Sequence, residues 1–116
     1  MRHNTKGTIL DRKTGPREAL LRSLATSVLL REKVKTTRAK AKAAAPLVEK
    51  AITIGKNGGV GARRALASML YGENVARKVV EVVSPRYKAR NGGYTRITAL
   101  GRREGDGAEM VQIALI

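Results

Sequence analysis

Apolar residues recur every three or four positions between residues 15 and 31, which is the spacing of one face of an α-helix. Gly15 fits the cap position and Pro16 the first turn, while Glu18 lies where the helix dipole favours an acid. The pattern predicts a helix within residues 15–33, up to the following strand. Its predicted buried face comprises Leu21, Leu24, Ala25 and Val28.

A second helix is predicted from residue 38 to about residue 56, with Thr37 as its cap. Pro46 interrupts this pattern, because a proline inside a helix removes one hydrogen bond and usually bends the axis. We therefore expect either a kink at Pro46 or a later start of the helix. The predicted buried face comprises Ala44, Leu47, Val48, Ala51 and Ile52.

Two shorter helices follow the glycine-rich segment 57–61, which we expect to be a loop that ends the second helix. One helix is predicted over residues 62–71 and the other over residues 73–83, where Ser84 and Pro85 should stop it. The residues expected to point inward are Leu66, Met69 and Leu70 in the first, and Val75, Val79 and Val82 in the second.

Three segments read as β-strands. Residues 33–37 are short and rich in β-branched side chains, and residues 94–100 and 109–116 flank the turn-rich segment 101–108. An isolated hairpin is marginally stable in water, so we expect the first segment to join the hairpin. The sequence thus predicts one two-layer α/β domain over residues 15–116, of order α-β-α-α-α-β-β, with a three-stranded sheet covered by helices. We expect residues 1–14 to form a basic RNA-binding arm at the N-terminus.

Charge is the dominant feature of the composition. The 116 residues include 24 Lys and Arg against 9 Asp and Glu, a formal net charge of +15. Such a charge destabilises a compact state by self-repulsion unless a polyanion neutralises it, which makes nucleic acid the leading partner. The chain has no cysteine, so disulfides, cysteine-based metal sites and thiol nucleophiles are excluded. Neither a membrane span nor a signal peptide is evident, and we expect a cytosolic protein.

The cations are grouped in segments without a single acid. These segments are residues 1–10, 33–48 and 82–103. A solvated surface usually mixes charges of both signs, whereas a polyanion site excludes carboxylates. The grouping therefore favours a surface that binds a polyanion over an ordinary solvent-exposed surface.

The start of the second helix carries cations where the helix dipole already presents positive charge. Arg38, Lys40 and Lys42 are unfavourable there unless a phosphate is bound by them, by free backbone N–H groups and by the hydroxyls of Thr36 and Thr37. The alternative is an ordinary capped helix with solvated lysines.

Residues 85–97, PRYKARNGGYTRI, combine four cations with two tyrosines and a glycine pair. Gly92 and Gly93 permit close approach of the backbone to a bulky ligand, or simply a turn into the strand. Tyr87 and Tyr94 can stack on unpaired bases, or equally fill the edge of a core that contains no Phe or Trp.

No catalytic, metal or cofactor site is evident. His3 is the single histidine and lacks partner ligands. Arg64 stands where a dinucleotide-binding fingerprint needs its last glycine, and Asn57 replaces the Ser or Thr of a phosphate-binding loop. We expect no small-molecule substrate.

Four motifs in one order, MRH…G…L…R, VKTTRAKAK, PRYKARNGGYTRI and GDGAEM, resemble the bacterial large-subunit ribosomal protein L17 family over nearly the whole chain. The resemblance implies a structural constituent of the large ribosomal subunit, without catalytic activity or cofactor. It also implies contacts with large-subunit ribosomal RNA near the peptide exit tunnel and with neighbouring ribosomal proteins, and a place in cytoplasmic or organellar ribosomes. The candidate RNA-binding residues are Arg2, His3, Lys6, Arg12, Lys13, Lys35, Thr36, Thr37, Arg38, Lys40, Lys42, Arg86, Tyr87, Lys88, Arg90, Gly92, Gly93, Tyr94 and Arg96.

Two other functions remain open on the sequence alone. A DNA-binding or nucleoid protein would use the same charge, and a phosphate-processing enzyme would need a base or metal ligands that the motifs do not supply. Copurification with ribosomal particles rather than with chromosomal DNA separates the first alternative from the ribosomal one.

Deletion of residues 1–10 should leave the stability of the domain almost unchanged, because the predicted core begins after the arm. We expect the truncated protein to be incorporated into large subunits less well than the full chain, since it lacks Arg2 and Lys6. Thermal unfolding and quantification in purified subunits measure the two effects. Undiminished incorporation would contradict a binding role for the arm.

Overall fold

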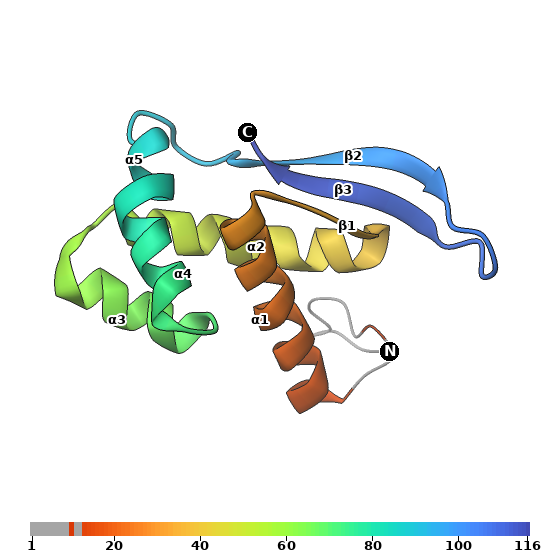
Figure 1. Ribbon diagram of the computed structural model, residues 1–116, viewed down its shortest axis with the longest axis horizontal. Helices are drawn as coiled ribbons and strands as arrows, with labels where there is room; N and C mark the ends of the chain where they lie inside the picture. The colour runs from red at the N-terminus through yellow and green to blue at the C-terminus, as the bar shows by residue number, and fades with distance from the viewer. Residues whose placement is uncertain (1–9, 11–12) are drawn as a thin grey trace, which may run out of the picture.

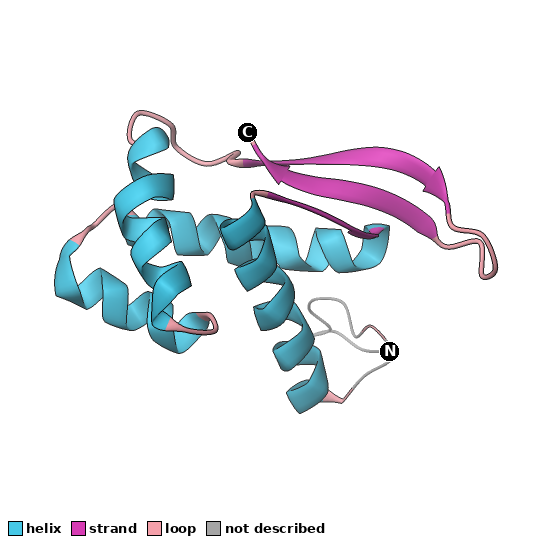
Figure 2. Cartoon of the chain, in the orientation of Figure 1, coloured by secondary structure: helices cyan, strands magenta, loops and turns pink. Residues whose placement is uncertain are grey.

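The computed structural model describes residue 10 and residues 13–116. Helices lie against one face of a three-stranded antiparallel sheet, and the segments alternate along the chain as the hydrophobic pattern predicts (Figure 1). The colouring by secondary structure separates the two layers, with the strands along one side of the molecule (Figure 2). The two-layer α/β fold is therefore confirmed.

Helix α1 comprises Thr14–Arg31 and begins one residue earlier than predicted. Lys13 is its N-cap residue, so Gly15 is not the cap but lies with Pro16 in the first turn. Its first turn contains no acid, because Glu18 lies one turn further along. The helix ends at Glu32, whose positive φ of 67° directs the chain into the first strand while its N–H donates to the Val28 carbonyl at 2.7 Å.

Helix α2 comprises Arg38–Gly55 and is the long helix beneath the sheet in Figure 1. Thr37 caps it as predicted, since its hydroxyl accepts a hydrogen bond from the Lys40 N–H at 3.4 Å. Pro46 lies inside the helix on its exposed side, so the alternative of a later helix start is wrong. The predicted buried residues Ala44, Val48, Ala51 and Ile52 are in the core, and Leu47 packs against it.

The next helices run further than the sequence suggested. Helix α3 comprises Gly59–Met69 and so begins inside the glycine-rich segment expected to be a loop. Helix α4, Glu73–Lys78, continues through a π-helical segment, Val79–Val83, into the short α5, Ser84–Arg86. Ser84 and Pro85 thus do not stop the helix. The five-residue hydrogen-bond spacing of the π-helix ends at Ser84, whose N–H donates to the Val79 carbonyl. Pro85 is tolerated because it lies in the first turn of α5, where its missing N–H would have no partner in the helix.

The π-helical segment changes which valine reaches the core. Val79 and Val83 are buried, whereas Val82, which we expected to point inward, is 45% exposed. The fourth residue after Val79 therefore faces inward, not the third. Regular helical spacing could not predict this choice, because positions three and four residues apart both lie near one face of an α-helix.

Strands β1 (Lys33–Thr37), β2 (Thr95–Arg102) and β3 (Glu109–Leu115) form the sheet in the order β1-β3-β2. The predicted addition of residues 33–37 to the hairpin is therefore confirmed. β2 extends past its predicted end at Leu100 and contains an irregularity between Ala99 and Gly101. Val111 and Ile113 of the central strand are buried on the face covered by α1 and α2.

At Gly55, α2 packs tightly against Val79 and Ser84 of the following helices. A Cβ atom on Gly55 would lie 2.8 Å from Val79 Cγ1 and closer still to the hydroxyl oxygen of Ser84. That hydroxyl cannot move freely, because it is buried and donates to the Ile52 carbonyl at 2.9 Å. Gly55 is thus required by packing and not by backbone conformation.

We expect Gly55→Ala to lower the free energy of unfolding by about 1–3 kcal/mol, the usual cost of overpacking a core. Urea denaturation monitored by circular dichroism measures it. Gly61→Ala is the matched control, because a Cβ at Gly61 meets nothing within 4 Å and alanine is the better helix former. An equal effect of both changes would contradict the packing argument.

Candidate nucleic-acid interface

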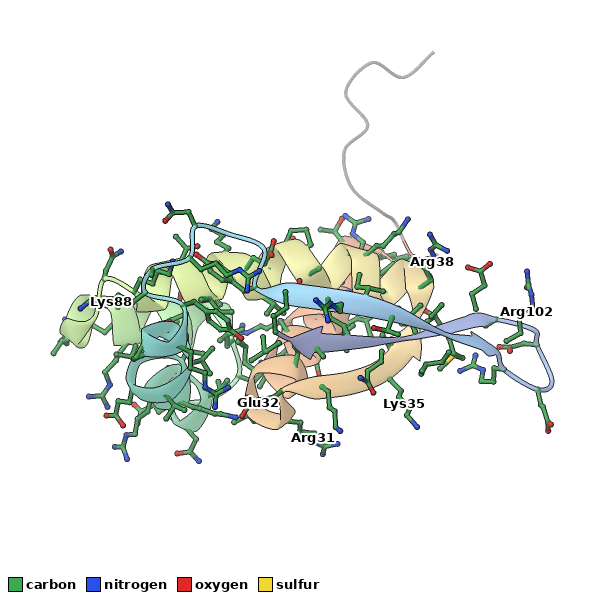
Figure 3. All side chains as sticks on the ribbon, turned by 90° about the horizontal axis from the view of Figure 1, so that it is seen from above. Arg31, Glu32, Lys35, Arg38, Lys88 and Arg102 are labelled. Atoms are coloured by element: carbon green, nitrogen blue, oxygen red, sulfur yellow. The ribbon has the colours of Figure 1, made fainter. Side chains whose placement is uncertain are left out.

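The predicted binding residues lie in separate places along the molecule. Figure 3 shows Arg38 and Arg102 toward one end, Lys88 at the opposite end, and Lys35 between them on β1 (Figure 3). The structure therefore does not gather the predicted cations into a single patch. Of the predicted binding residues in the arm, Lys13 lies within the described part of the chain, as the exposed N-cap residue of α1. Arg2, His3, Lys6 and Arg12 lie outside the described residues.

The start of α2 borders a shallow hollow of about 420 Å³. Its lining is Thr37, Arg38, Ala39, Lys42, Ala108 and Glu109. Thr37 is already occupied as the cap, and Thr36 is partly buried on the helix-covered face of β1. The ammonium groups of Lys40 and Lys42 form no ion pair with any described residue, so they remain available to an anion.

A carboxylate from a distant part of the chain lies at this helix start. Glu109 of β3 approaches Arg38 at 3.5 Å and Arg102 at 3.6 Å. Segment 33–48 contains no acid in the sequence, but the fold places Glu109 beside it. The spacing of residues along the chain could not predict this. Both pairs are more than half open to water on the cation side, so the attraction is weak and does not close the site to a phosphate.

Arg86, a predicted RNA contact, is engaged within the protein. Its guanidinium binds both carboxylate oxygens of Glu32, one of them at 3.2 Å, and Lys78 approaches the same carboxylate at 3.4 Å. The hydrogen bond from Arg86 holds the pKa of the Glu32 carboxyl below its ordinary value, and the same bond raises the pKa of Arg86. Arg86 therefore connects α5 to the end of α1. Any RNA phosphate would have to compete with Glu32 for its guanidinium.

Tyr87 and Tyr94 belong to the core. Their side chains are 4% and 2% exposed, and their ring centroids lie 5.1 Å apart with the planes tilted by 49°. Such a pair is a favourable aromatic contact in a core that is otherwise aliphatic. Of the two alternatives that the sequence left open, the structure thus has the core one, and neither ring has a free face for stacking on a base.

The two phenol groups are held by different partners. Tyr87 donates to the Ile116 carbonyl at 2.6 Å, and burial raises the pKa of its phenol. Tyr94 accepts a hydrogen bond from Lys56 at 2.6 Å, which lowers the pKa of its phenol, and donates to the Arg90 carbonyl at 3.1 Å. Lys56 also lies 4.7 Å from the centre of the Tyr94 ring.

The buried tyrosines fix the loop that carries the exposed cations Lys88 and Arg90. Gly92 and Gly93 adopt φ values of 90° and 65°, and a Cβ on either would meet nothing within 4 Å. Their role seen here is therefore the turn into β2, which other residues adopt only with strain. The loop presents Lys88 and Arg90 to solvent from a fixed base.

Sequence reasoning missed two residues that organise this surface. Glu32 was not singled out, although it is the one acid between Glu18 and Glu49 and so the only local counter-charge in that segment. Lys56 was predicted only as the last residue of the second helix, yet its ammonium group binds the Arg90 carbonyl and the Tyr94 hydroxyl. No sequence spacing links residue 56 to residues 90 and 94.

Two features of other protein classes are missing from the described part of the chain. Within it, no three histidine, cysteine, aspartate or glutamate side chains come together as a metal site. Among the same residues, no helix has the length and apolar character needed to cross a membrane.

Comparison with known proteins identifies the family. The model of the ribosomal protein L17 family matches residues 20–116. The chain belongs to this family. The large ribosomal subunit protein bL17 of Acidobacterium capsulatum is 48% identical over 100% of this chain and 72% of its own length, and that of Exiguobacterium is 49% identical over 92% and 96%. The bL17 protein of Dehalococcoides mccartyi is 45% identical over 100% and 99%. L17 proteins are structural components of the ribosome and not enzymes.

Glu32→Gln tests the internal role of Arg86. Because the pKa of Glu32 is lowered in the folded state, its contribution is present above about pH 4.5 and lost as the pH falls through the lowered value. We expect a loss of about 0.5–1 kcal/mol in the free energy of unfolding at pH 7, as for a partly exposed ion pair, and no difference at strongly acidic pH.

Urea denaturation at several pH values measures this difference. Glu104→Gln is the matched control, since Glu104 is exposed and forms no ion pair with the described residues. An effect of Glu32→Gln that persists unchanged below pH 3 would show that the charge is not the cause.

Proposed function

We propose that this protein binds large-subunit ribosomal RNA near the peptide exit tunnel, mainly through phosphate contacts, and so supports assembly of the subunit and translation. In this proposal it acts within the ribosome of the cytoplasm, beside neighbouring ribosomal proteins. The observation that carries the proposal is a surplus of exposed cations without internal partners in a chain of the L17 family.

The distribution of the acids supports this view. Glu32, Asp106 and Glu109 are each paired with arginine, and Glu49 accepts a hydrogen bond from the Tyr94 N–H at 3.0 Å. These carboxylates are used inside the protein, which leaves few to balance the surface. By contrast, Lys35, Lys42, Lys88, Arg90 and Arg96 form no ion pair with any described residue.

The spacing of the cations favours an extended polyanion over a small phosphate ligand. Arg38 at the start of α2 and Lys88 beyond α5 lie toward opposite ends of the molecule. One small ligand could not bridge them, whereas folded RNA presents phosphates over such a surface. Membership of the L17 family favours the ribosome over chromosomal DNA.

The start of α2 adds a specific element to the proposal. Its cap uses the Thr37 hydroxyl, and the helix dipole together with Lys40 and Lys42 favours a phosphate beside the first turn. Glu109 lies at the edge of this hollow and limits where the phosphate can sit. The site is therefore a positioning contact rather than a closed phosphate pocket.

The decisive experiment measures binding of the full chain to a bacterial large-subunit rRNA transcript as a function of salt. If about 6–10 phosphates are neutralised, affinity should fall by about 10³–10⁵ between 50 and 200 mM salt, with duplex DNA as a guide. Replacement of Arg38, Lys40 and Lys42 together by Glu should abolish most of this affinity while circular dichroism shows a folded domain, since acids are tolerated at a helix start.

The matched control replaces Arg63, Arg64 and Arg77 by Glu, which alters net charge equally on α3 and α4. This control should retain much more RNA affinity than the first variant. Affinity independent of salt, or equal losses in both variants, would contradict the proposed phosphate contacts. Crosslinks of the protein within purified large subunits test its position near the exit tunnel.

A further inference from the structure

The sheet has one face covered by helices and one face open. In the central strand β3, Val111 and Ile113 point to the helices, so Gln112 and Ala114 point the other way. Figure 3 looks down on the sheet from above, with its strands nearer to the viewer than α2. This outward side is defined here as the open face.

The strand register places cations on both sides of Ala114. Lys33 of β1 and Arg96 of β2 are both paired with Ala114, and Lys35 and Thr98 are both paired with Gln112. Directly paired residues in neighbouring strands point to the same face. Lys33, Lys35 and Arg96 therefore surround a small central residue on the open face.

These three cations are exposed and have no internal partner. Lys33, Lys35 and Arg96 make no side-chain hydrogen bond or ion pair with any described residue. The paired positions across the open face carry Gln112, Ala114 and Thr98, none of which is an acid. Glu32 precedes Lys33, but its carboxylate is already bound to Arg86 and Lys78. The open face is thus a cationic surface without counter-charge.

We propose that the open face binds the sugar–phosphate backbone of ribosomal RNA. This inference rests on the proposed function and adds a specific surface to it. Lys33 and Arg96 lie two strand spacings apart, about 10 Å, so backbone phosphates can approach between them over the small Ala114. The Gln112 amide and the Thr98 hydroxyl can hydrogen-bond phosphate oxygens or ribose hydroxyls in the same place.

Backbone recognition is favoured over recognition of bases because the open face carries no aromatic side chain. Sheets that read unpaired bases present aromatic rings for stacking. In this chain Tyr87 and Tyr94 are buried in the core, and Tyr71 lies between α3 and α4. The open face should therefore contribute affinity and salt dependence without sequence preference.

An acidic protein segment is the competing occupant. Protein interfaces usually have an apolar centre that excludes water, whereas the middle of the open face carries Lys33, Lys35 and Arg96 around the small Ala114. The exposed Leu100 lies away from this centre, at the irregular end of β2. Cations at the centre of the surface fit a hydrated polyanion better. RNA is therefore the occupant that the surface favours.

The test uses the full chain, a bacterial large-subunit rRNA transcript and no other protein. We expect Lys33→Ala with Arg96→Ala to reduce the slope of log affinity against log salt by about 1.4–1.8, or about 0.7–0.9 for each lost phosphate contact. Arg63→Ala with Arg64→Ala removes the same charge from α3 and should change the slope by less than half as much.

A second variant separates binding from folding. Ala114→Glu places a carboxylate between Lys33 and Arg96, which should stabilise the strand pairing and compete with phosphate. We expect its RNA affinity to fall at least several-fold while its thermal midpoint is unchanged or higher. Ala114→Gln is the uncharged control of similar size, so it should lose clearly less RNA affinity than Ala114→Glu.

Each outcome has a defined meaning. If the wild-type chain does not bind the transcript in a salt-dependent way, the proposed function fails. If it binds but the open-face variants keep the wild-type slope and affinity, the open face does not contact RNA, and the proposed function stands on the other sites. Equal slope changes in the α3 control, or equal losses in Ala114→Gln, would also overturn the inference.

Discussion

Mutual repulsion among cations is the constraint under which this fold forms, because 24 Lys and Arg residues share the chain with only 9 acids. The structure reduces this repulsion by placing carboxylates where two helices or strands meet. Glu32 connects the end of α1 to Lys78 and Arg86, and its backbone carbonyl accepts from the Leu115 N–H at 2.9 Å. At the hairpin turn, Arg103 and a backbone N–H bind Asp106 and lower its pKa to about 2.

This use of the acids has a consequence for function. A carboxylate at a joint stabilises the fold and is no longer available to neutralise the outer surface. The remaining cations, among them Lys35, Lys88 and Arg96, are therefore left to a partner outside the chain. The excess of cations over acids thus explains both the internal ion pairs and the cations that have no partner inside the chain.

The aromatic pair links the core to the exposed loop. Tyr87 and Tyr94 enclose the turn formed by Gly92 and Gly93, and their burial fixes the backbone from which Lys88 and Arg90 project. Lys56 completes the arrangement through the Tyr94 hydroxyl. The loop is thus ordered from within, so in the proposed function its cations would bind RNA without first ordering a flexible segment.

Local pattern determined much of this protein. The sequence predicted the extents of α2 and β1, the Thr37 cap and the grouping of cations, because each depends on residues a few positions apart. The resemblance to the L17 family could likewise be recognised from short motifs. Tertiary structure alone decided which cations are engaged and which are free. The ion pair between Glu109 and Arg38 joins residues 71 positions apart, and that between Glu32 and Arg86 joins residues 54 positions apart. Tyr87 and Tyr94 are buried in the core and not exposed to solvent. Such contacts arise from chain packing, and no periodicity or spacing along the sequence encodes them.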